Sequence, residues 1–305
     1  MPLKLMYITN RPDVAVIAER NGVDRIFVDM EYIGKDLRQG RLDTVQNHHT
    51  IGDVRNIRAV ISKAELLVRV NPIHEATDEY TSSEEEINAV IEAGADIIML
   101  PYFKTVEEVY RFLSIVNGRT RTMLLLETQE AAAILDILLT MKGIDEIHIG
   151  LNDLSISRNQ KFLFEPLADG TVERLCMKMK LAGKFYGFGG VASLGRGMVP
   201  AETIIKEHYR LGSQMAILSR SFCNINNFED MDAIEEIFYR GIREIRALEK
   251  ECRFHMDYFS QNREELIAAV DNIVDGIVES STATDQDEQM TGKGNAQPDE
   301  ENGLD

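Results

Sequence analysis

The sequence predicts an α/β fold, a (β/α)8 TIM barrel with an extra C-terminal helix and a disordered acidic tail. Three observations lead to this fold class. A junction of helix end, glycine and short apolar run occurs four times, the apolar runs are nearly continuous, and eight such runs alternate with amphipathic stretches. Continuous apolar runs are typical of parallel strands buried on both faces. Eight β-then-α units fit a closed barrel better than the alternative, an open doubly wound sheet.

The repeated junction places a glycine where a helix is expected to end. It occurs at residues 21–29, 93–101, 142–150 and 211–218. Glycine suits this place because it adopts a positive φ without the clash that a Cβ atom would cause. The apolar run after each glycine is therefore predicted to be the next strand.

Eight such strands are predicted, with helices between them. The strands are expected at residues 3–9, 25–31, 65–70, 96–101, 122–127, 146–151, 184–189 and 214–219. One of the intervening helices is predicted to begin at a capping box formed by Ser83 and Glu86, because serine and glutamate three residues apart satisfy each other's backbone N–H groups.

The chain is predicted to divide into three parts. Residues 1–248 form the barrel, which is the catalytic domain, residues 249–280 a helical extension, and residues 281–305 a disordered acidic tail. The extension is surplus to the barrel, so it covers either its own barrel or a neighbouring subunit, and we favour the subunit. The tail has seven acids, one lysine and no aromatic residue, so it cannot bury enough apolar area to offset its ordering entropy.

Charge and composition exclude several classes of function. The net charge of −18 disfavours a nucleic-acid partner and an anionic membrane surface. No apolar stretch reaches the roughly 20 residues that a bilayer requires, and no signal peptide is recognisable. The three cysteines form no CxxC motif, which argues against a disulfide framework and a thiolate zinc site. We expect a cytoplasmic protein that binds a small molecule.

The carboxyl ends of barrel strands are where active-site residues are expected. Glu127 and Asp153 end neighbouring strands about 5 Å apart, so their carboxylates would repel unless a cation lies between them. Oxygen ligands suit Mg²⁺ or Mn²⁺; the alternative is that both carboxylates pair with arginines or cap loops. Arg69, at another strand end, is either a fork for a substrate carboxylate or a structural partner of Glu31 or Glu127.

Five short motifs resemble those of a known family in the same order. They are IFVDME at 26–31, LVRVNP at 67–72, MLPY at 99–102, LLET at 125–128 and IGLNDLS at 149–155. Together they resemble the HpcH/HpaI aldolase and citrate lyase β-subunit family of the phosphoenolpyruvate/pyruvate superfamily, over roughly residues 1–245.

The resemblance implies a function and a set of site residues. It implies a metal-dependent carbon–carbon lyase, similar to class II aldolases, that acts on a pyruvate-like 2-oxo acid through an enolate. Glu127 and Asp153 would bind the divalent metal, Mg²⁺ or Mn²⁺. Arg69 would bind the substrate's carboxylate or keto oxygen, and backbone N–H groups near Asn152 and Asp153 the other carboxylate oxygens. The family also implies a homo-oligomer, a trimer or hexamer with exchanged C-terminal helices.

The sequence departs from the aldolase branch at two positions. That branch places a histidine, its catalytic base, directly after the glutamate of the second strand, where this chain has Tyr32. Tyrosine, with an ordinary pKa near 10, is a poor base at neutral pH. A glutamine of that branch is replaced by Leu125. Two alternatives therefore stay open: a citrate-lyase-like acyl-CoA lyase or thioester hydrolase, and a non-catalytic barrel used as an assembly module.

His48 and His49 are the candidates for the missing catalytic group. They lie in a long loop, residues 34–52, after the second strand, and such loops on the functional face of a barrel select substrate. The alternative is that both are solvent-exposed. His148 lies within a strand and is expected in the core or behind the site.

Two features near the last strands carry weaker expectations. Residues 187–192 match GxGxxA, but they lie on the seventh strand, so a dinucleotide site is disfavoured. Close approach of this backbone to a substrate is favoured, because the region after strands seven and eight binds phosphate in many barrels. Arg220 follows the eighth strand and would meet either a second anionic group or a neighbouring subunit.

Overall fold

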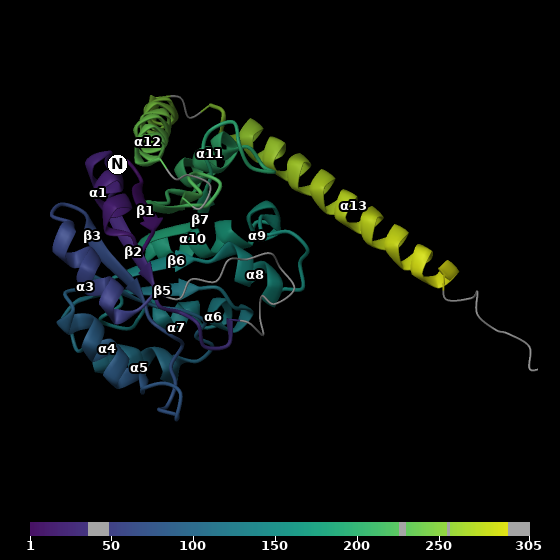
Figure 1. The fold of residues 1–305 in the computed structure, drawn as a ribbon. Coiled ribbons are helices and arrows are strands. Elements are labelled where there is room, and N and C mark those ends of the chain that lie inside the picture. The colour runs from purple at the N-terminus through teal and green to yellow at the C-terminus, as the bar shows by residue number, and fades with distance from the viewer. Residues whose placement is uncertain (36–48, 226–229, 255–256, 292–305) are drawn as a thin grey trace, which may run out of the picture.

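Eight parallel strands close into a barrel in chain order. The computed structural model describes residues 1–35, 49–225, 230–254 and 257–291, so the predicted catalytic residue His48 lies outside the described residues. The strands are β1 (Lys4–Ile8), β2 (Arg25–Asp29), β3 (Glu65–Arg69), β4 (Ile97–Leu100), β5 (Arg121–Leu126), β6 (Glu146–Ile149), β7 (Phe185–Val191) and β8 (Met215–Leu218). Because β8 pairs with β1, the predicted (β/α)8 barrel is confirmed (Figure 1).

The helices surround the barrel (Figure 1). They are α1 (Pro12–Arg20), α3 (Ile51–Val60), α4 (Ser83–Glu92), α5 (Val106–Val116), α6 (Gln129–Ala133), α7 (Leu135–Leu138), α8 (Leu151–Ser157), α9 (Glu165–Ala168), α10 (Thr171–Leu181), α11 (Ala201–Leu211), α12 (Met231–Phe254) and α13 (Phe259–Thr291). No helix in the described part of the chain is both long and apolar enough to span a membrane.

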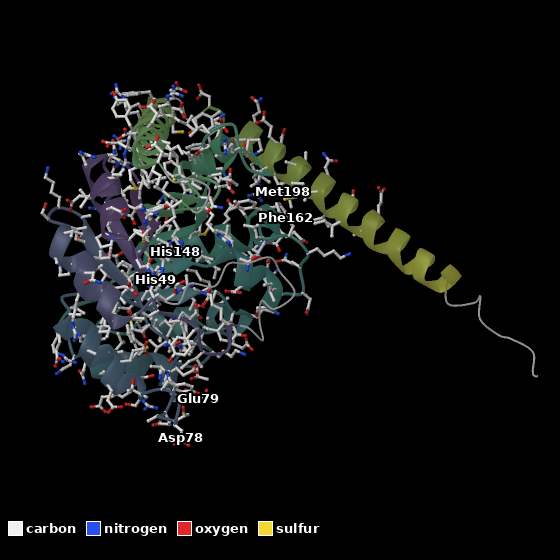
Figure 2. The ribbon with its side chains drawn as sticks, viewed as in Figure 1. His49, Asp78, Glu79, His148, Phe162 and Met198 are labelled. Carbon is white, nitrogen blue, oxygen red and sulfur yellow. The ribbon has the colours of Figure 1, made fainter. Side chains whose placement is uncertain are left out.

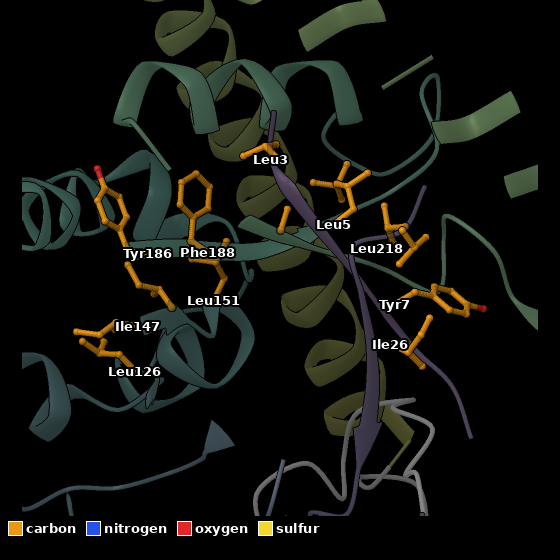
Figure 3. Packing of buried hydrophobic residues seen from close by; sticks show 14 of the residues in the cluster. Leu3, Leu5, Tyr7, Ile26, Leu126, Ile147, Leu151, Tyr186, Phe188 and Leu218 are labelled. Carbon is orange, nitrogen blue, oxygen red and sulfur yellow. The ribbon is translucent and has the colours of Figure 1, made fainter. Parts of the chain in front are cut away.

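The main apolar core lies between the strands and the helices. Residues such as Leu5, Ile26 and Leu218 point outward from their strands into this layer (Figure 3). A second apolar cluster fills the inside of the barrel and includes Met6, Phe27 and Met99. Each fully buried large apolar side chain stabilises the fold by about 1.5–3 kcal/mol. Strands buried on both sides explain why the sequence shows continuous apolar runs.

An ionic layer crosses the barrel interior at the amino ends of the strands. Arg25, with 1% of its side chain exposed, donates to both oxygens of Glu146 at 2.6 and 2.8 Å and to Glu65 at 2.8 Å. Arg121 donates to Glu65 at 2.7 Å and lies 3.5 Å from Glu146. These four residues, which we call the ionic layer, balance one another's charge inside the barrel.

The predicted capping box of α4 is wrong by one residue. Ser82, not Ser83, is the N-cap, and it exchanges hydrogen bonds with Glu85. Ser83 instead accepts a hydrogen bond from the backbone of His74, and the buried Glu86 carboxylate accepts from Asn71. Both serine–glutamate pairs fit the same motif, so only the packing of α4 against the barrel decides between them.

The C-terminal helix is longer than predicted. It begins at Phe259 and runs to Thr291, so residues 281–291, predicted to be tail, are helical; residues 292–305 lie outside the described residues. Extending a helix adds one hydrogen bond per residue fixed, so a segment too polar for a core can still continue a helix. Asn262 of α13 donates to Thr203 and Glu207 of α11, so the first turns of the helix cover their own barrel, while the rest extends past it (Figure 1).

Candidate active site

A cavity of about 530 Å³ opens at the carboxyl ends of the strands. Its lining comes from most strands of the barrel and contains five of the six predicted site residues, His49, Arg69, Glu127, Asn152 and Asp153. The polar lining also includes Asp29, Lys35, His148, Ser219, Arg220 and Asn224. The structure thus brings the predicted metal ligands and the predicted substrate-binding arginine together.

Glu127 lies directly after β5 with only 2% of its surface exposed. Its Oε1 accepts a hydrogen bond from the backbone N–H of Tyr102 at 2.9 Å. A Cβ atom at Gly150 would lie 2.8 Å from Oε2 of Glu127, so glycine at 150 leaves the space that this carboxylate occupies. The residue after the sixth strand therefore helps to position the carboxylate after the fifth.

Asp153 lies in the first turn of α8, which begins directly after Gly150. The first N–H groups of a helix have no hydrogen-bond partner within the helix. In α8 they lie in the same turn as Asp153 and are available as donors. β5 and β6 are neighbours, with Leu126 beside Ile149, which places Glu127 and Asp153 on adjacent chain segments at the cavity.

The donor set fits a hard divalent ion. Carboxylate oxygens are the ligands that Mg²⁺ and Mn²⁺ prefer, and Mg²⁺ commonly takes one or two carboxylates from a protein and keeps waters or substrate oxygens. In the described part of the chain no three histidine, cysteine or acidic side chains cluster as a ligand set. An ion held by Glu127 and Asp153 would therefore take its other ligands from water or substrate.

Arg69 is held by two carboxylates of β2 and the residues that follow it. It donates from Nε and Nη2 to the two oxygens of Asp29, each at 2.7 Å, and its Nη1 lies 3.1 Å from Glu31. Burial acts to lower the pKa of Arg69, but Asp29 and Glu31 outweigh it and hold that pKa well above its ordinary value. The arginine is thus charged and fixed in place while its edge lines the cavity.

Lys35 completes this cluster and was not identified from the sequence. It is buried, and its Nζ lies 3.1 Å from Asp29 and 3.7 Å from Glu31. No helical signal in the sequence marks this pair, because residues 33 and 34 between Glu31 and Lys35 form a turn. With two acids and two bases, the group of Asp29, Glu31, Lys35 and Arg69 is neutral by itself; we call it the Arg69 cluster.

His49 reaches the cavity with a defined hydrogen bond. Its Nδ1 accepts from the backbone N–H of Asp29 at 3.0 Å, so Nε2 carries the proton of the neutral ring. Burial lowers the pKa of His49, and the nearby charges of Lys35 and Arg69 act in the same direction, against Asp29 and Asp53. The ring is therefore neutral near pH 7 and presents an N–H donor.

His148 lines the same cavity, although the sequence led us to expect it in the core or behind the site. Its Nε2 donates to the carbonyl of Gly189 at 3.2 Å, and its Nδ1 has no hydrogen-bond partner among the described residues. Burial lowers the pKa of His148 to about 4. Both His49 and His148 are labelled in Figure 2, at the centre of the barrel.

The two positions that depart from the aldolase branch have different surroundings. Tyr32 is 41% exposed, packs edge-on against Tyr80 and does not line the cavity. Burial of part of its ring raises the pKa of Tyr32 further, with Glu86, Tyr80 and Glu79 adding to the effect. Leu125 does line the cavity, beside Glu127. Neither residue supplies a base near the carboxylates.

Comparisons with known proteins give one family match and several structures of similar fold. Residues 4–161 match the family model described as HpcH/HpaI aldolase/citrate lyase. A family protein of that description from Burkholderia cenocepacia J2315 is 15% identical, with a TM-score of 0.57, over 77% of this chain and 94% of that one. No curated protein sequence matches at a significant level.

Two further solved structures are similar in the same way. The HpcH/HpaI aldolase from Desulfitobacterium hafniense DCB-2 is 16% identical, with a TM-score of 0.54, over 80% of this chain and 93% of that one. The citrate lyase beta subunit from M. tuberculosis, in complex with oxaloacetate and magnesium, is 11% identical, with a TM-score of 0.52, over 78% and 97%. At these identities the likeness shows a shared fold.

Proposed function

Because the chain belongs to the HpcH/HpaI aldolase/citrate lyase family, we propose that it is a divalent-metal-dependent carbon–carbon lyase that acts on a pyruvate-like 2-oxo acid through an enolate. The observation that carries the proposal is that Glu127 and Asp153 line one cavity with Arg69 at the carboxyl end of the barrel. The Mycobacterium citrate lyase beta subunit supports it, since oxaloacetate, its ligand, is a 2-oxo acid.

Glu127 and Asp153 are the residues that would hold the metal. Their oxygens match Mg²⁺ or Mn²⁺, and the limited protein ligand set leaves places for a bidentate 2-oxo acid. A divalent ion supplies a Lewis acid that stabilises negative charge as it develops on the keto oxygen.

Arg69 and the start of α8 would orient the substrate. The Arg69 cluster fixes the guanidinium through Asp29, so its remaining N–H groups are pre-positioned for the substrate carboxylate. We propose that the backbone N–H groups of Asn152 and Asp153 bind the other oxygens. A carboxylate held at both ends keeps the keto carbon near Glu127 and Asp153, which lowers the entropic cost of reaction.

His49 would donate a hydrogen bond from Nε2. Its Nδ1 already accepts from the backbone N–H of Asp29, so the ring has no free nitrogen with which to abstract a proton while neutral. A hydrogen-bond donor at Nε2 stabilises a substrate oxygen as it gains negative charge. His48 remains a predicted catalytic residue.

Oligomerisation and location are part of the same proposal. The family resemblance implies a trimer or hexamer, and α13 extends past its own barrel, where a second subunit has access to it (Figure 1). We propose a cytoplasmic homo-oligomer with no nucleic-acid or membrane partner. Light scattering on purified full-length protein gives the subunit number directly.

Calorimetric titration of the metal-loaded protein with oxalate and with pyruvate tests the proposal. We expect oxalate, an enolate mimic, to bind more tightly than pyruvate and to require Mg²⁺ or Mn²⁺. Glu127→Ala should abolish metal-dependent binding, whereas Glu130→Ala, three residues on and exposed, should not. Wild-type protein that binds neither ligand, or a Glu127→Ala variant that binds as well as wild type, would refute the proposed function.

A further inference from the structure

A second cavity, of about 770 Å³, lies beside the first. It is bounded by the loop after β7, the segment after β8 and one face of α12. Its charged lining consists of Arg196, Arg220, Arg240 and Glu244, and its apolar floor includes Phe222 and Ile237. Three arginines against one acid among the described lining residues make this a positive site on a chain whose net charge is −18.

The arginines come from three separate elements. Arg196 lies in the loop between β7 and α11, Arg220 follows β8, and Arg240 lies on α12. No hydrogen bond or ion pair is recorded for the guanidinium groups of Arg196 and Arg220 among the described residues. Arg240 pairs at 2.7 Å with Glu236, an exposed i to i+4 pair worth little energy. The guanidinium groups are therefore available to a ligand.

The loops that carry two of the arginines are held together. Ser193 donates from Oγ to the carbonyl of Phe222 at 2.9 Å, which ties the loop after β7 to the segment after β8. Gly197, next to Arg196, has φ of +100°, and a Cβ atom there would lie 2.7 Å from the carbonyl of Val199. Gly241, next to Arg240, allows α12 to approach the ring of Phe222, which a Cβ atom would meet at 2.6 Å. These close contacts hold the backbone segments that carry the three arginines in place.

The two cavities share part of their lining. Arg220, Cys223 and Asn224 contribute to both. A ligand that filled the second cavity would therefore lie next to a ligand that filled the first. Since Arg220 stands between them, an elongated molecule could place one end near Glu127 and its other end among the arginines.

We propose that the second cavity binds the phosphoryl group of a phosphorylated co-substrate; its role as co-substrate rests on the proposed function, whereas the binding does not. A phosphoryl dianion has three acceptor oxygens and two negative charges, so it suits a site where several guanidinium forks converge. The loops after the seventh and eighth strands are where barrels commonly bind phosphate. The floor formed by Phe222 and Ile237 suits the carbon part of such a molecule.

Calorimetric titration of the full-length protein with glycerol 3-phosphate, inorganic phosphate and pyrophosphate tests this site. We expect binding that weakens as salt rises, roughly tenfold weaker in Arg196→Gln and in Arg240→Gln, and weaker still in the double variant. Arg243→Gln is the matched control, because Arg243 lies on α12 but does not line the cavity. Tighter binding of glycerol 3-phosphate than of inorganic phosphate identifies an organic ester as the ligand, and the reverse identifies the free ion; both support a phosphoryl site.

Three results would overturn the proposal. They are no binding of any of the three probes, binding unaffected by the Arg196→Gln and Arg240→Gln substitutions, and equal loss in the Arg243→Gln control. Glu127→Ala separates this test from the proposed function. The variant should lose oxalate binding and keep glycerol 3-phosphate binding, so failure at one cavity is distinguishable from failure at the other.

Discussion

The backbone N–H of Asp29 donates to Nδ1 of His49 at 3.0 Å, while the carboxylate of Asp29 clamps Arg69 with two hydrogen bonds of 2.7 Å. One strand-end residue therefore orients both a predicted catalytic histidine and the predicted substrate-binding arginine. Because the backbone provides the bond to His49, the tautomer of the ring is fixed whatever side chain stands at 29. The Nε2–H group is therefore the donor that His49 can offer to a ligand in the cavity.

Replacing His49 should impair proton transfer more than binding. We expect His49→Ala to slow metal-dependent exchange of the methyl protons of pyruvate by about 10²-fold or more, the usual cost of removing one hydrogen-bond donor to an oxygen that gains negative charge. Affinity for oxalate should change only a few-fold, since Arg69 and the metal ligands remain. Proton NMR in D₂O measures the exchange. A variant that exchanges at the wild-type rate excludes His49 from the chemistry.

Adding one methyl group at Gly150 should weaken metal binding. In Gly150→Ala the new Cβ would lie 2.8 Å from Oε2 of Glu127, so the carboxylate must move. We expect affinity for Mn²⁺ to fall about tenfold, the lower range for disturbing the support of a metal ligand. Electron paramagnetic resonance of Mn²⁺ measures it. Gly276→Ala is the control, because a Cβ there meets nothing; equal affinity in both variants would contradict the placement of Glu127.

Two buried histidines should make the protein less stable in acid. Burial lowers the pKa of His148 to about 4 and that of His208 to about 3. Between pH 6.5 and 4 the unfolded chain takes up protons at these residues and the folded chain does not, so stability is full above pH 6.5 and falls as the pH falls. The loss is about 1.4 kcal/mol per pH unit for each histidine. Below pH 4 only His208 continues to contribute, until about pH 3.

Urea unfolding between pH 7 and 4 measures this slope. His208 stacks on Phe188 with ring centroids 3.9 Å apart, so His208→Phe keeps an aromatic ring in place. We expect the variant to lose about half of the slope that the two histidines produce. Parallel stability curves for variant and wild type would show that folding does not lower the pKa of His208.

The ionic layer should respond strongly to loss of one charge. Glu146→Gln leaves Arg25 buried without its bidentate partner, so we expect a loss of about 3–5 kcal/mol in the free energy of unfolding. Glu235→Gln, which breaks the exposed pair with Arg20, should cost less than about 1 kcal/mol. The double variant Arg25→Met, Glu146→Leu should be more stable than Glu146→Gln. Chemical denaturation of the variants provides the comparison.

The sequence predicted the barrel because its local signals agreed with the fold. Each of the eight expected strands overlaps an observed one, since runs such as 25–29 and 146–149 are buried on both faces. The family resemblance is confirmed by the match over residues 4–161. The α4 capping box shows the limit of a local motif. Both serine–glutamate pairs match it, and only the burial of Ser83 and Glu86 excludes them as the cap.

The site was predicted in part, for a physical reason. The sequence pointed to Glu127 and Asp153 because a charged residue that follows a buried apolar strand costs free energy unless it is paired or binds a ligand. For Arg69 the structure shows the pairing with Glu31 that one alternative held, and a closer pairing with Asp29; its binding of a substrate carboxylate stays a prediction. Lys35 and His148 were missed because their place in the cavity depends on where a loop turns and which face of β6 points inward, and neither is encoded by local periodicity.

The ionic layer also determines by which end of the barrel small molecules can reach the cavity. The buried Arg25–Glu146 pair fills the interior at the amino ends of the strands. Substrate and product should therefore both use the opening at the carboxyl ends, where Glu127 lies. A product must then leave through the same opening by which the next substrate molecule enters. We therefore expect the products of the proposed lyase reaction to compete with the substrate for this entrance, so that the rate falls as products accumulate.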